Sequence, residues 1–70
     1  MMVTALKLER VRSGMRQWRL ASLVGISQAE LSHYETGRRQ CSVDLRDKIA
    51  KALDRPVETL FPATEEKSSL

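Results

Sequence analysis

Cysteine and histidine are nearly absent from this 70-residue sequence, which holds one of each, Cys41 and His33. A lone cysteine excludes an intrachain disulfide framework. One cysteine with one histidine cannot supply the four ligands of a structural zinc site. We therefore expect no metal. The fold has to rest on a single compact apolar core, because a chain this short has a thin margin of stability.

Long apolar runs and catalytic patterns are also missing. The apolar runs span only a few residues, so no membrane span is expected. Lys7, Glu9 and Arg10 interrupt the N-terminal stretch, which argues against a secretory signal and favours a cytoplasmic location. With one histidine, no Ser/His/Asp spacing and no glycine-rich phosphate loop, the sequence predicts no enzyme, no cofactor and no evident small-molecule effector.

The charge is mildly basic, with 12 Lys+Arg against 9 Asp+Glu and a net charge of +3. This balance is compatible with a polyanionic partner but does not require one. Arginine supplies most of the positive charge. Its planar guanidinium suits bidentate contacts to phosphates and bases better than the lysine ammonium does.

Strand-like alternation is absent, and short stretches of helical periodicity are separated by glycine and proline. The pattern predicts five helices, over residues 4–13, 17–24, 27–35, 42–53 and 56–60. Ser27 and Glu30 form a capping-box pattern at the start of the third. Pro56 is suited to open the fifth. We expect one domain over residues 1–62, of all-α class, followed by a disordered polar tail over residues 63–70.

The most informative stretch begins at Gln17. Counted from that residue, small or apolar residues fall at positions 4, 5, 8, 9, 10, 15 and 18, namely Leu20, Ala21, Val24, Gly25, Ile26, Leu31 and Tyr34. Two helices that cross steeply over a tight turn require this spacing. Ala21 fits where the helices touch, and Gly25 accommodates the turn. The sequence therefore predicts a helix-turn-helix.

These residues resemble the Cro/cI-like (XRE-type) phage repressor family. The resemblance lies in Arg10, in the pattern QxxLAxxVGISQxxLSxYExGR that runs from Gln17 to Arg38, and in the closing segments IAKAL and VETLF. It covers roughly residues 5 to 62 of the chain. It implies a compact five-helix lambda-repressor-like bundle whose third helix enters the major groove of DNA.

The resemblance also implies roles for individual residues. Gln28 would pair with adenine and Ala29 would touch a thymine methyl group. The residues expected to contact bases are Gln28, Ala29, Ser32 and His33. Those expected to contact phosphates are Arg16, Gln17, Ser27, Arg38 and Arg39. Arg10 and Glu35 would form an internal ion pair between the first helix and the end of the third.

Five positions depart from the family pattern, namely Arg16, Trp18, Arg19, Cys41 and Pro56. Arg16 stands where an N-capping serine or threonine is usual, so the cap is lost but a cation is gained beside the phosphate path. Trp18 and Arg19 replace residues that are commonly acidic. Two interpretations of Trp18 remain open from the sequence: packing beside the first helix, or contact with DNA or a protein.

The resemblance implies a sequence-specific transcriptional regulator, which we expect to act as a repressor and to bind a palindromic operator in double-stranded DNA as a homodimer. We expect the dimer interface to include Val57, Leu60 and Phe61, which are the apolar residues least committed to the bundle. Alternatively, Leu60 and Phe61 cap the core. A second hypothesis for the function is an antitoxin that binds a toxin and represses its own operon, although residues 63–70 are too short to wrap around a partner.

Overall fold

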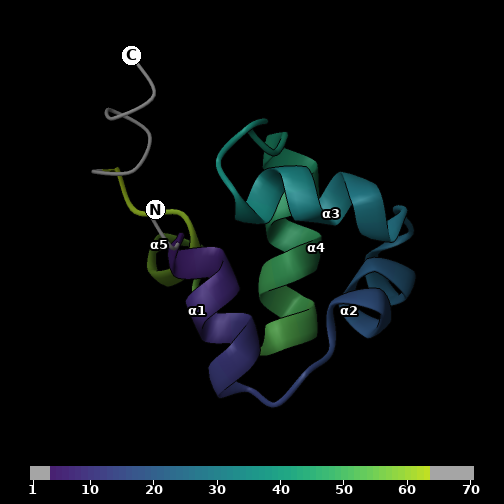
Figure 1. Cartoon of the computed structure of the whole chain (residues 1–70). Helices are drawn as coiled ribbons and strands as arrows, with labels where there is room; N and C mark the ends of the chain where they lie inside the picture. Colours follow the sequence, from purple (N-terminus) through teal and green to yellow (C-terminus); the bar gives the residue numbers. More distant parts are fainter. Residues whose placement is uncertain (1–3, 64–70) are drawn as a thin grey trace.

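The computed structural model describes residues 4–63, which fold into five helices (Figure 1). They are α1 (Ala5–Arg12), α2 (Gln17–Val24), α3 (Gln28–Glu35), α4 (Val43–Leu53) and α5 (Val57–Leu60). No strand occurs between residues 4 and 63, and the predicted all-α, five-helix fold is confirmed. The predicted helices differ from these mainly by their capping residues. Apart from Ala63, the predicted tail lies outside the described residues.

Hydroxyl side chains begin three of the helices. Thr4, Ser27 and Ser42 each accept a hydrogen bond from the backbone N–H three residues later, over 3.2, 3.0 and 3.2 Å respectively. Each bond satisfies an N–H group that the helix leaves without an internal partner. The Glu30 carboxylate of the predicted capping box accepts a hydrogen bond from the Tyr34 hydroxyl over 2.8 Å. This bond raises the pKa of Tyr34, because it favours the protonated phenol.

The turn between α2 and α3 follows from Gly25, which has a φ of 80° in the left-handed region. The N–H groups of Gly25 and Ile26 both donate to the Ala21 carbonyl, over 2.9 and 3.0 Å. Only glycine reaches this conformation without a steric penalty. Ala21 is 2% exposed. Its small side chain lies in the core beside this turn, so the sequence spacing produces the predicted helix-turn-helix.

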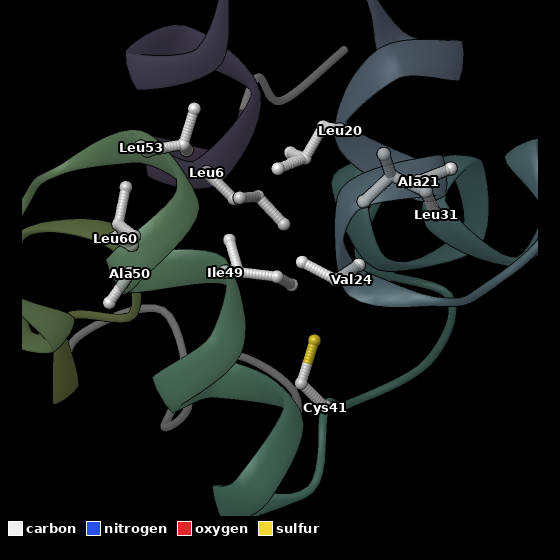
Figure 2. Packing of buried hydrophobic residues seen from close by; sticks show 10 residues of the cluster. All are labelled: Leu6, Leu20, Ala21, Val24, Leu31, Cys41, Ile49, Ala50, Leu53 and Leu60. Carbon is white, nitrogen blue, oxygen red and sulfur yellow. The ribbon is translucent and has the colours of Figure 1, made fainter.

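Each of the five helices contributes one fully buried aliphatic side chain to the same core: Leu6, Leu20, Leu31, Ile49 and Leu60. Figure 2 shows these side chains converging between the ribbons, with the Cys41 sulfur directed into the cluster. Burial of each such side chain stabilises the fold by about 1.5–3 kcal/mol. None of the described helices is long and apolar enough to cross a membrane.

Candidate nucleic-acid interface

Glu35, the last residue of α3, is the one buried charged residue among those the structure describes. Its carboxylate forms a two-point contact with Arg10 of α1. The Arg10 Nε lies 2.5 Å from Glu35 Oε2, and Nη2 lies 3.1 Å from Oε1. The side chains of Arg10 and Glu35 are 11% and 1% exposed. The structure thus brings together the two residues that were expected to pair.

Further hydrogen bonds surround this ion pair. Arg10 Nη1 donates to the Met15 carbonyl over 2.8 Å, in the loop that leads to α2. The Thr4 hydroxyl donates to the backbone carbonyl of Glu35 over 2.7 Å. These bonds compensate the desolvation of both charges, a condition that a buried ion pair needs in order to be tolerated. They also fix the C-terminal end of α3 against α1.

The network continues to the opposite end of α3 through two glutamines. Gln17 Nε2 donates to Glu35 Oε1 over 3.1 Å. Gln17 Oε1 accepts a hydrogen bond from Gln28 Nε2 over 3.2 Å. Gln17 therefore links the buried carboxylate to Gln28, the first residue of α3. This internal role of Gln17 was not predicted from the sequence, where its signal was the placement of polar residues at both ends of the motif. One of the two N–H donors of the Gln17 amide remains for another acceptor.

The first turn of α2 lacks a side-chain cap. Arg16 occupies the N-cap position with a φ of −75° and a ψ of 151°, and its side chain makes no hydrogen bond to the turn. The N–H groups at the start of a helix attract anions when they are not capped. Arg16 itself is exposed. The beginning of α2 therefore presents backbone N–H groups and a guanidinium at one place.

The residues expected to read bases lie on the outer side of α3. Gln28 and Ala29 are exposed, whereas Ser32 and His33 are half-buried. Leu31 and Glu35 face inward and are at most 2% exposed. The Ser27 hydroxyl caps α3 by accepting from the Glu30 N–H. Ser27 can still donate its own hydroxyl hydrogen.

Arg38 and Arg39 follow α3 in an exposed turn. The N–H groups of both residues donate to the His33 carbonyl, over 2.9 and 3.3 Å. These bonds hold the turn close to the last turn of α3. The backbone of Arg38 and Arg39 is therefore held beside the C-terminal end of the helix that carries the expected base contacts.

The expected dimer interface needs one correction. Leu60 is fully buried in the core of its own chain, so the prediction that it contacts a partner is wrong for this conformation. A one-turn helix packed on α1 turns this residue inward. Val57 and Phe61 are only half-buried. The guanidinium of Arg46 lies 5.1 Å from the centre of the Phe61 ring, which is within the range of a cation–π contact.

Comparison with known protein families also identifies a helix-turn-helix in this chain. The family model described as a helix-turn-helix domain matches residues 2–60, and this domain is found in XRE-type regulators. Among curated proteins, no sequence matches the chain.

Proposed function

The chain belongs to the helix-turn-helix domain family, and on that premise we propose that it represses transcription by binding a palindromic DNA operator as a homodimer. DNA binding by a regulator is the general role that the family suggests. The finer parts of the proposal are the repressor role, the operator symmetry, the dimer and the residues that contact DNA. The domain we assign to this role spans residues 1–62.

One observation carries the proposal: the hydrogen-bonded series from Arg10 through Glu35 and Gln17 to Gln28. It fixes both ends of α3 while Gln28 and Ala29 on the outer side of that helix stay exposed. A helix that reads bases has to be held rigidly, because each base contact depends on its position to within a fraction of an ångström. This arrangement favours α3 as the helix that enters the major groove.

The residues that we assign to DNA contact divide into two groups by their chemistry. The Gln28 amide has an acceptor and a donor that match the N6 amino group and N7 of adenine in the major groove. The Ala29 methyl group can contact the methyl group of thymine. Ser32 and His33 lie one turn further along, where they reach bases or phosphates. Arg16, Gln17, Ser27, Arg38 and Arg39 surround α3 and supply donors to phosphate oxygens. Phosphate contacts fix the position of the protein on the duplex, and base contacts supply the sequence preference.

A dimer follows from the small size of one such surface. A single recognition helix covers about half a turn of DNA, and two-fold dimers present two of them about 34–36 Å apart. We assign the interface to Val57 and Phe61, which keep part of their surface exposed next to the buried Leu60.

The test begins with selection of bound sites from random-sequence DNA. We expect an enriched palindrome whose half-sites are one helical turn apart. Sedimentation equilibrium with and without the selected duplex should give two chains per site. Val57→Glu should weaken that assembly, whereas Val11→Glu, at an exposed position of α1, should not. Failure to enrich any sequence would contradict sequence-specific binding, and one chain per site at all concentrations would contradict the dimer.

A further inference from the structure

Trp18 has a large side chain that takes no part in the hydrogen-bond network around Glu35. We propose that Trp18 lies against the DNA backbone, with its indole N–H donating to a phosphate oxygen and its ring packed on the adjoining sugar. This inference rests on the proposed function, because it adds a contact to the same DNA-facing surface. It assigns to Trp18 a backbone contact that does not depend on base sequence.

The exposure of Trp18 excludes a role in the core. The residue is 56% exposed, while its neighbours on the inner side of α2, Leu20, Ala21 and Val24, belong to the core. Of the two interpretations left open by the sequence, extensive packing beside α1 is therefore disfavoured. An indole combines a large apolar surface with one N–H donor. A partner that covers it has to offer both an apolar area and an acceptor, and a deoxyribose with its phosphate offers both.

Trp18 lies in the turn of α2 that meets the start of α3. It is the second residue of α2 and directly follows Gln17. Because Gln17 Oε1 accepts a hydrogen bond from Gln28 Nε2 over 3.2 Å, the first turn of α2 and the first turn of α3 lie together. A duplex that meets Gln28 therefore passes close to the first turn of α2. Trp18 therefore stands next to the residue that links α2 to the base-reading end of α3.

The charge around Trp18 favours a polyanion. No acidic residue occurs from Arg10 to Ala29, a stretch that contains Arg12, Arg16 and Arg19 in addition to Arg10. Arg16 and Arg19, two residues before Trp18 and one after it, are exposed. Cations on both sides draw a phosphate backbone toward the indole. In this arrangement the arginines supply charge and Trp18 supplies the apolar contact to the sugar.

The fluorescence of Trp18 gives a direct test, because it is the only tryptophan in the chain. The intact protein is titrated with a short mixed-sequence duplex, with excitation at a wavelength that Tyr34 does not absorb. Binding is followed in parallel by the anisotropy of a dye on the DNA. We expect the indole emission to change with the same midpoint as the anisotropy. A contact to the backbone should give this response on mixed-sequence and selected duplexes alike.

Substitutions then separate the parts of the contact. Trp18→Ala should lower the affinity for both duplexes about tenfold, the loss expected when a hydrogen bond to a charged group is removed. Trp18→Phe keeps an apolar ring and should lose less. Neither change should alter the slope of log K against log salt, because no cation is removed. Leu23→Ala is the matched control, since Leu23 lies on the same helix and is also 56% exposed; its affinity should equal that of the wild type.

Two results would overturn the inference in distinguishable ways. If the wild type binds the duplex by anisotropy while the indole emission stays constant and Trp18→Ala binds equally well, the Trp18 contact is wrong and DNA binding stands. That result would leave the exposed indole to a protein partner. If the wild type binds no duplex at all, the proposed function itself is wrong. The thermal unfolding of each variant is measured as well, so that a loss of DNA affinity can be distinguished from a loss of folded protein.

Discussion

Gln28 and Gln17 are hydrogen-bonded to each other, with Gln28 Nε2 3.2 Å from Gln17 Oε1. The first residue of α3 is thereby held by the first residue of α2 before any DNA is present. A side chain that is already ordered loses less conformational entropy when it binds. In the base contact that we propose for Gln28, this side chain would therefore lose less conformational entropy than a freely rotating one.

Replacement of Gln28 by alanine should reduce both affinity and sequence preference. The variant loses a bidentate base contact, so we expect about 1–3 kcal/mol of lost binding free energy at the selected site and relaxed preference at one base pair. Competition between the selected and a scrambled duplex measures this ratio. Should the variant keep the wild-type ratio, Gln28 does not read sequence. Thr59→Ala, at an exposed position of α5, serves as the control.

Arg38→Ala and Arg39→Ala should each weaken binding to every sequence and reduce the salt slope by about 1, because each removes one phosphate contact and the counterion that it displaces. The measurement is the affinity for a mixed-sequence duplex over a series of salt concentrations. Lys51→Ala removes an exposed cation from α4 and should leave the slope unchanged. An unaltered slope in both arginine variants would contradict the phosphate contacts.

Loss of one partner of the Arg10–Glu35 pair should strongly destabilise the fold. Arg10→Met leaves the carboxylate of Glu35, which is 1% exposed, without its counter-ion, at a cost of about 3–5 kcal/mol. Urea unfolding measures the change. Arg12→Ala breaks an ion pair with Glu9 in which the arginine side chain is 64% exposed, and should cost less than about 1 kcal/mol. Equal losses in the two variants would show that burial of the Arg10–Glu35 pair is energetically unimportant.

Cys41 should make the stability fall at alkaline pH. Burial raises the pKa of its thiol from 9.0 to about 11. Above pH 9 the unfolded chain releases this proton while the folded chain keeps it, so the free energy of unfolding decreases as the pH rises from about 9 to 11. Below pH 9 the thiol is protonated in both states and has no such effect. Denaturant unfolding at several pH values should show a smaller alkaline decrease in Cys41→Ala; identical decreases would contradict the raised pKa.

Periodicity and caps were sufficient to predict the helices, because they depend on residues close together in the chain. Ser27, Gly25 and Ser42 each act through neighbours within a few positions. The spacing from Gln17 to Tyr34 predicted the crossing of α2 and α3 for the same reason.

Contacts that depend on the packing of elements far apart in the chain were harder to predict from the sequence. Helical spacing places Val57, Leu60 and Phe61 on one side of the short α5 segment, so the sequence does not show which of them is buried. The packing of α5 on α1 shows that it is Leu60. The link from Glu35 through Gln17 to Gln28 requires side chains from two helices to meet at hydrogen-bond distance. The exposure of Trp18 depends in the same way on the tertiary arrangement.

Every helix contributes one fully buried aliphatic residue to the core. This shared core affects how the protein unfolds on heating. Opening of any one helix removes one of these five side chains from the shared core, so we expect the core helices to be lost cooperatively on heating. If α3 reads DNA as proposed, the surface that it presents would be lost over the same narrow temperature interval in which the bundle unfolds.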